Sequence, residues 1–250
     1  MRAAGRLRVV ADRLVLWDFD GTLAWREGMW SGCALDVLDE HAPGHGVSIE
    51  RARTALRGGF PWHAWEHPHP HLSEPGAWWE VVERRIAEAF EQLYAGGDAA
   101  RMAGALRERY LDVAVAWQLF EDTEPALRAL SDRGWRHAVL SNHVPELPAL
   151  IDGLGLTARF DAVFTSAAIG YEKPHPEAFR IALAGCGNPA EVWMVGDNPH
   201  ADVEGAESAG LRAILVRGAG RARHRAEGLD GAAALILGES EAGADATATP

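Results

Sequence analysis

The sequence predicts an α/β fold, in which a Rossmann-like, doubly wound parallel sheet carries an inserted α-helical cap. From residue 124 onwards, short apolar runs alternate with amphipathic segments, and this alternation is typical of βαβ units. Residues 28–110 contain long helix-favouring segments and no convincing strand. We therefore expect a core made of residues 1–27 and 111–238, and a cap made of residues 28–110.

The first predicted strand is a short apolar run that ends in two aspartates. Residues 14–17 read LVLW, which suits a strand covered on both faces. Asp18 and Asp20 follow directly, and Gly21 allows the chain to turn sharply after them. Two carboxylates this close repel each other and lose hydration at the end of a buried strand. We therefore expect a cation to compensate them.

The predicted cap consists of helices joined by a long connection. Residues 74–97 and 99–113 are the strongest helical segments, whereas residues 58–76 are rich in Pro, Gly and His and predict a loop. The histidines of this loop alternate with proline in an irregular segment, and no helix is predicted there that would anchor an i, i+4 pair as a metal site, which favours solvated side chains. They are His63, His67, His69 and His71.

After the cap, four further strands are predicted, with helices before and between them. The apolar runs occupy residues 137–142, 161–166, 191–197 and 212–218. The amphipathic segments occupy residues 124–134, 146–155, 175–185 and 201–210. These strands and the first one should form a single parallel sheet. The small and acidic residues 239–250 predict a disordered tail.

Composition excludes several classes of protein. The chain carries 24 basic and 36 acidic residues, and its net charge of −12 opposes general attraction to nucleic acid or anionic membranes. The basic run at residues 221–225 is therefore expected to be an exposed loop. Cys33 and Cys186 are the only cysteines, which excludes a disulfide scaffold. Cys33 is expected to be a small buried residue, and neither cysteine is expected to be catalytic. Without a spanning segment or a signal peptide, we expect a cytoplasmic protein, as monomer or homodimer.

Polar residues follow the predicted strands at the edge where parallel sheets bind their ligands. Ser141 and Asn142 end one strand, Gly196 and Asp197 end another, and Lys173 lies in an intervening loop. Together with Asp18 and Asp20, they would place several carboxylates, a hydroxyl and an ammonium group at one edge. Asp202 follows five residues after Asp197.

Four motifs stand in this order along nearly the whole chain: DFDGTLA, LSN, EKP and VGDNPHAD. On these motifs the chain resembles the haloacid dehalogenase superfamily, specifically its phosphatase-like branch with a helical cap inserted after the first motif. A D-x-D-G sequence alone also opens calcium loops, but four motifs in order are specific.

The resemblance implies a Mg²⁺-dependent phosphatase that hydrolyses a small phosphorylated metabolite through an aspartyl-phosphate. Asp18 would be the nucleophile, and Asp20 would protonate the leaving group and later activate water. Mg²⁺ would be held by Asp18, Asp197 and the backbone carbonyl of Asp20. Lys173 would neutralise charge on the transferring phosphoryl group.

The same resemblance assigns supporting roles to five other residues. Ser141 and the Asn142 amide would hold phosphate oxygens, and the Thr22 hydroxyl would support the first loop by a hydrogen bond. Gly196 would let the chain pass close to a ligand, and Asp202 would anchor Lys173 or a metal-bound water. As simpler alternatives, Ser141 caps the next helix and Asp202 caps the helix of residues 201–210.

The motifs leave other functions open. A sugar phosphomutase would share them, whereas a 2-haloacid dehalogenase usually lacks the second aspartate, present here as Asp20. A phosphonate hydrolase that uses a cap lysine is disfavoured, because residues 28–110 contain no lysine. A catalytically silent small-molecule binding protein is the non-enzyme alternative. The cap should select the substrate, and the residues expected on its inner surface are Arg26, Trp30, His63 and Trp65.

Overall fold

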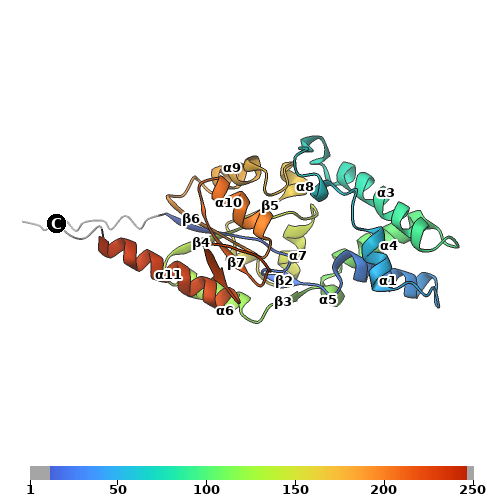
Figure 1. Cartoon of the computed structure of the whole chain (residues 1–250), viewed down its shortest axis with the longest axis horizontal. Helices are drawn as coiled ribbons and strands as arrows, with labels where there is room; N and C mark the ends of the chain where they lie inside the picture. The colour runs from blue at the N-terminus through green and yellow to red at the C-terminus, as the bar shows by residue number, and fades with distance from the viewer. Residues whose placement is uncertain (1–11, 247–250) are drawn as a thin grey trace, which may run out of the picture.

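A computed structural model describes residues 12–246 and contains a six-stranded parallel sheet (Figure 1). The strand order is β5-β4-β1-β6-β7-β8, so the first strand lies in the middle of the sheet. The strands are β1 (Arg13–Trp17), β4 (Trp135–Ser141), β5 (Ala162–Thr165), β6 (Glu191–Gly196), β7 (Arg212–Val216) and β8 (His224–Ala226). This is the doubly wound α/β architecture that the sequence predicts.

Helices cover both faces of the sheet because the side chains of β1 alternate between two apolar layers. Leu14 and Leu16 pack in the layer that contains residues of α9 (Pro176–Gly185) and α10 (Gly205–Ser208). Val15 and Trp17 pack in the layer that contains residues of α6 (Thr123–Ser131), α7 (Leu147–Gly153) and α11 (Leu229–Ala246). Figure 1 shows α9 and α10 on one side of the sheet and α6 and α11 on the other.

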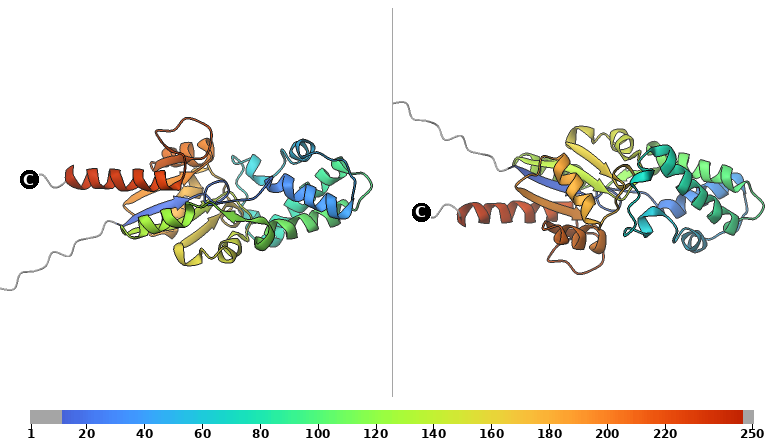
Figure 2. Two further views of the ribbon diagram at one scale, coloured as in Figure 1. Left: turned by 90° about the horizontal axis from the view of Figure 1, so that it is seen from below. Right: turned by 90° about the horizontal axis from the view of Figure 1, so that it is seen from above.

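The cap is a group of four helices at one end of the sheet, away from the C-terminal end of α11 (Figure 2). They are α1 (Met29–His41), α2 (Ile49–Ala55), α3 (Pro75–Leu93) and α4 (Ala99–Leu111). Helix α3 begins with a proline in its first turn, and its buried residues Trp78, Val82, Ile86, Ala89 and Leu93 recur at helical spacing. Helix α3 packs against α4 and α2, and its buried residues belong to the same apolar cluster as one layer of the core.

Short elements connect the cap to the core. The antiparallel strands β2 (Ala24–Trp25) and β3 (Gln118–Leu119) pair where the chain enters and leaves the cap, a ribbon that the sequence does not predict. The remaining helical segments are η1 (Pro61–His63), η2 (Pro70–Leu72), α5 (Val113–Ala116), η3 (Thr157–Arg159), α8 (Ser166–Ile169) and η4 (Pro199–Glu204). None of the helices within residues 12–246 combines the length and the apolarity needed to cross a bilayer.

Two expectations need correction. Helix α11 continues to Ala246, so residues 239–246 are not a disordered tail. Alanine and glutamate favour helix, and the buried side chains of Leu229 and Ile236 anchor the helix in the core. Residues 1–11 and 247–250 lie outside the described residues. The basic run at residues 221–225 is not wholly loop, because β8 begins at His224 and pairs with β7.

Candidate active site

The site lies where the strand order reverses around β1. Trp17 is paired with Val139 of β4 on one side and with Val195 of β6 on the other. The next residue, Asp18, donates its backbone N–H to Val195 O at 2.9 Å, so it emerges between the loops that follow β4 and β6. In open α/β sheets this reversal leaves a crevice at the carboxyl ends of the strands.

Two glycines allow the carboxylates to approach one another. Gly21 has φ +74°, and a Cβ on it would lie 2.5 Å from Asp197 Oδ2. A Cβ on Gly196 would lie 2.1 Å from Asp202 Oδ2. Any other residue at either position would displace an acidic side chain of the site.

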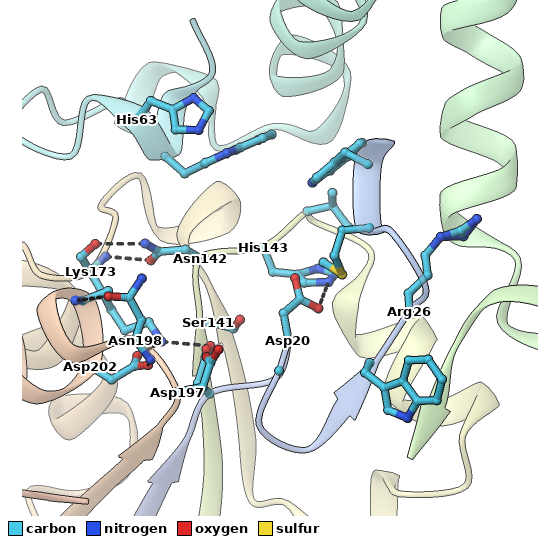
Figure 3. A pocket seen from close by; sticks show the side chains of 18 of the residues that line it. Asp20, Arg26, His63, Ser141, Asn142, His143, Lys173, Asp197, Asn198 and Asp202 are labelled. Atoms are coloured by element: carbon cyan, nitrogen blue, oxygen red, sulfur yellow. Dashed lines mark hydrogen bonds and ion pairs between the residues drawn. The ribbon is translucent and has the colours of Figure 1, made fainter. Parts of the chain in front are cut away.

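Lys173 is buried between two of these carboxylates (Figure 3). Its Nζ lies 2.9 Å from Asp18 Oδ1 and donates to Asp202 Oδ1 at 2.6 Å. Burial alone would lower the pKa of Lys173, but the charges of Asp18 and Asp202 outweigh it and raise that pKa. The lysine is therefore a permanent cation, and it is the only lysine of the chain.

One ammonium does not balance the three carboxylates around it. Single oxygens of Asp18, Asp197 and Asp202 lie within 4.8 Å of one another. Burial, followed by the charges of Asp18 and Asp202, raises the pKa of Asp197 to about 7. Burial likewise raises the pKa of Asp202 to about 6, against the effect of Lys173. A further cation would balance the negative charge of the three carboxylates. A hard divalent ion, which prefers oxygen ligands, fits them.

Ser141 and Asn142 follow β4 and line the same cavity. The side chain of Asn142 braces the lysine loop: its Nδ2 donates to Lys173 O at 2.9 Å, and Lys173 N donates to its Oδ1 at 2.7 Å. The simpler alternative for Ser141 is wrong, because the next long helix, α7, has Glu146 at its N-cap.

The hydrogen bonds of Asp202 and Thr22 also differ from those that the sequence suggests. Asp202 does not cap a helix, because Asn198 is the N-cap of η4 and accepts from two backbone N–H groups there. Asp202 instead accepts from Asn198 N at 2.9 Å and from Lys173. The hydrogen bond expected of the Thr22 hydroxyl is not found among residues 12–246. The turn is held instead by Leu23 N and Ala24 N, which both donate to Phe19 O.

Two residues that the sequence did not single out lie beside Asp20. His143 Nε2 is 3.5 Å from Asp20 Oδ1, and the Tyr110 hydroxyl lies 3.3 Å from the same nitrogen (Figure 3). Both side chains are buried, and burial, followed by the charge of Asp20, raises the pKa of Tyr110 well above its usual value. His143 directly follows the LSN motif, and this position could have identified it as a site residue from the sequence. Tyr110 ends a cap helix 90 residues after Asp20, and nothing local marks it.

A cavity of about 590 Å³ lies between these groups and the cap, and the side that the cap contributes is largely aromatic. Trp30 and His63 line it, as expected. Arg26 lines it too, but its guanidinium is turned to the cap and donates to Arg109 O and Asp36 Oδ2, each at 3.2 Å. Trp65 is not among the lining residues, and its ring packs against His200.

The histidine loop is not entirely solvated. His63, His67 and His71 are exposed, but His69 is buried, and its Nε2 lies 3.0 Å from Glu172 Oε1, also buried. Glu172 directly precedes Lys173, so this pair fastens the cap loop to the lysine loop. Cys33 is buried, as predicted, and so is Cys186; burial raises the pKa of the Cys33 thiol to about 12.

Residues 13–210 match the profile of the haloacid dehalogenase-like hydrolases. The chain belongs to this family. Haloacid dehalogenase-like hydrolase domain-containing protein 3 of Mus musculus is 32% identical over 217 residues, which cover 82% of each chain. A phosphoserine phosphatase of Thermus thermophilus is 32% identical over 222 residues, which cover 82% of this chain and 88% of that protein.

Solved structures of haloacid dehalogenase-like proteins share this fold. The HAD-hydrolase YfnB of Bacillus subtilis, bound to magnesium, superposes with a TM-score of 0.70 at 19% identity, covering 91% of this chain and 99% of that one. L-2-haloacid dehalogenase of Xanthobacter autotrophicus gives a TM-score of 0.65 at 23% identity, with the same coverage. At this identity the likeness concerns the fold alone. The arrangement of cap and sheet therefore does not separate phosphatases from dehalogenases.

Proposed function

We propose that the protein is a Mg²⁺-dependent phosphatase that hydrolyses a small phosphorylated metabolite through an aspartyl-phosphate on Asp18. One observation carries the proposal: Asp18, Asp197 and Asp202 converge around Lys173 at the carboxyl ends of the strands, and a fourth carboxylate, Asp20, lines the same cavity. Relatives named as phosphatases support it, including the phosphoserine phosphatase and a glyceraldehyde 3-phosphate phosphatase of Methanothermobacter thermautotrophicus, 40% identical over 101 residues.

The reaction takes two displacements. A carboxylate oxygen of Asp18 bonds to phosphorus while the ester P–O bond breaks, and Asp20 gives its proton to the departing alkoxide oxygen. A water oxygen then bonds to the same phosphorus, Asp20 takes a proton from that water, and the bond from phosphorus to Asp18 breaks. The products are an alcohol and orthophosphate, and both aspartates return to their starting states.

The surrounding groups lower the cost of bringing two anions together. Lys173 places a buried positive charge beside Asp18, and Asp202 fixes the position of that charge. Ser141 and the Asn142 amide would bind phosphate oxygens. Mg²⁺, held by Asp18, Asp197 and the Asp20 carbonyl, would supply the remaining positive charge. The cap would exclude bulk water during the reaction.

Phosphate release from an aryl phosphate in the presence of Mg²⁺ tests the proposal. The wild type should release orthophosphate, and Asp18→Asn should abolish release while the thermal transition and the circular dichroism spectrum stay those of a folded protein. If wild type and Asp18→Asn are equally inactive over a broad panel of phosphate esters, the protein is a binding protein instead.

The rival functions give different products. A phosphomutase would return a sugar phosphate isomer without net release of orthophosphate, and a dehalogenase would release halide from a 2-haloacid. Asp20 favours the phosphatase over the dehalogenase, because a departing halide needs no proton. A cytoplasmic location and a monomeric or homodimeric state remain predictions.

A further inference from the structure

The two sides of the cavity differ in chemistry, and the difference concerns the part of the substrate that is not phosphate. Resting on the proposed function, we infer that the substrate is a phosphate monoester whose organic group is uncharged and carries a flat apolar ring. Charged amino-acid or amine phosphates are then poor substrates.

The first observation is a stack of nearly parallel rings in the cap. Phe60 and Trp62 are 4.5 Å apart at 7°, Trp62 and Trp30 are 5.6 Å apart at 17°, and Trp30 and Tyr110 are 3.9 Å apart at 8°. Trp30, Trp62 and Tyr110 line the cavity. Because the faces of these rings stack on one another, the rings present rigid apolar edges to the cavity, and such a pre-formed surface can contact another apolar ring at little cost in ordering.

Tyr110, at the end of the stack, lies close to Asp20, which would protonate the leaving oxygen. The Tyr110 hydroxyl lies 3.3 Å from His143 Nε2, which in turn lies 3.5 Å from Asp20 Oδ1. An ester oxygen at Asp20 therefore directs the carbon attached to it towards Tyr110 and Trp30. The organic group of the substrate is placed against the rings by the same contact that the chemistry requires.

The cap side of the cavity offers no free charge. Among the described lining residues contributed by the cap and its entry strand, only Arg26 and His63 are ionisable besides Tyr110. Arg26 is committed to Asp36 and to the Arg109 carbonyl. Desolvation, followed by the charge of Arg85, lowers the pKa of His63 and so disfavours the charged form of this side chain. Arg85 itself donates to the Gly58 carbonyl.

A charged organic group would lose hydration in this cavity without gaining a partner. The ammonium and carboxylate of phosphoserine need opposite charges when they are buried, and unpaired burial of either is costly. An uncharged aromatic group loses little on leaving water and gains contacts with Trp30 and Trp62. The geometry therefore separates this chain from an enzyme built for phosphoserine, although a relative bears that name.

Four primary alkyl esters test the inference without a bias from leaving-group chemistry: 2-phenylethyl phosphate, ethyl phosphate, phosphoethanolamine and phosphoserine. We expect kcat/KM for 2-phenylethyl phosphate to be about tenfold higher than kcat/KM for ethyl phosphate. We expect it to exceed kcat/KM for phosphoethanolamine and phosphoserine by a larger factor. Equal or better hydrolysis of phosphoserine, phosphoethanolamine or ethyl phosphate overturns the inference but leaves the phosphatase standing. Absence of phosphate release from all four esters, and from an aryl phosphate, removes the phosphatase itself.

Cap variants locate the preference. Trp62→Ala should lower kcat/KM for 2-phenylethyl phosphate by about tenfold and change that for ethyl phosphate by less than about twofold, whereas Trp62→Phe should retain most of it. Trp65→Ala is the matched control, since Trp65 lies in the same loop but outside the cavity. If Trp62→Ala lowers both esters equally while the protein stays folded, or if Trp65→Ala has the same selective effect, the rings do not select the substrate.

Discussion

The sheet edge and the cap surface line one cavity, but the side chains on each of the two sides interact with their neighbours through different forces. At the sheet edge, charged groups pair with one another at fixed distances, as Lys173 does with Asp18 and Asp202. On the cap side, rings stack, and Arg26, the one arginine among the described residues that line the cavity, is turned away. The charged side can perform the same chemistry on any phosphate ester, whereas the aromatic side can distinguish among them. Variants on the two sides should therefore affect different kinetic quantities.

After Asp18→Asn, which should abolish activity, the largest effect is expected at Asp20, on the charged side. Asp20→Asn removes the proton donor and should lower kcat for an alkyl ester by about 10³-fold. With p-nitrophenyl phosphate, whose leaving group needs no proton, the loss should be far smaller. Steady-state kinetics on both esters measure the difference. An equal loss on both would show that Asp20 does not act as the general acid.

Lys173 should come next. Lys173→Met leaves the carboxylates of Asp18 and Asp202 without their ammonium partner, and kcat should fall by about 10²-fold for every ester alike. The variant should also have a lower thermal midpoint, because buried charges lose their partner. Asn142→Ala, which removes two hydrogen bonds to the lysine loop but keeps the ammonium group, is the comparison and should have the smaller effect. A change in the ranking of the esters would contradict the division between the two sides.

Stability should depend on pH through the acidic cluster. In the folded, metal-free protein the pKa of Asp197 is raised to about 7, above the ordinary value of 3.8. Between these two pH values the folded state therefore binds more protons than the unfolded state does. Its stability should therefore fall as pH rises from about 4 to about 7. Asp197→Asn should raise the metal-free thermal midpoint by about 5 °C at pH 8 and little at pH 4. Thermal scans with a chelator test this, and Mg²⁺ should stabilise the wild type more than the variant. An unchanged difference across pH would refute it.

The smallest effect is expected where the two sides meet. Tyr110→Phe keeps the ring in the stack but removes the hydroxyl beside His143 and Asp20. A lost hydrogen bond of about 1 kcal/mol corresponds to roughly a fivefold decrease in kcat, with KM nearly unchanged. Tyr110→Leu should in addition raise KM for the aromatic ester. An effect of Tyr110→Phe on KM alone would place the hydroxyl on the substrate instead.

The charged side could be predicted from sequence, and the aromatic side could not. Asp18, Ser141 and Asp197 each follow an apolar strand, and parallel pairing alone brings such positions to one edge. The stack of Trp30, Trp62 and Tyr110 has no such rule, because helix packing decides which rings meet. A high count of tryptophans indicated packing in the cap but not its geometry.

Contacts between distant segments were likewise beyond prediction. His69 meets Glu172 across 103 residues, and a histidine in a proline-rich segment gives no sign of such a partner. The composition of residues 239–246 indicated disorder, but helix α11 is anchored upstream by core contacts of Leu229 and Ile236 and extends from there. In both cases the missing information was a tertiary contact.

The solitary lysine makes the protein unusually easy to observe. Every other basic side chain among the 24 Lys and Arg residues is an arginine, so isotopic labelling of lysine would yield one side-chain signal, from the Nζ wedged between Asp18 and Asp202. A ligand arriving at the site would shift that signal directly. The single lysine signal would therefore report whether the site is occupied.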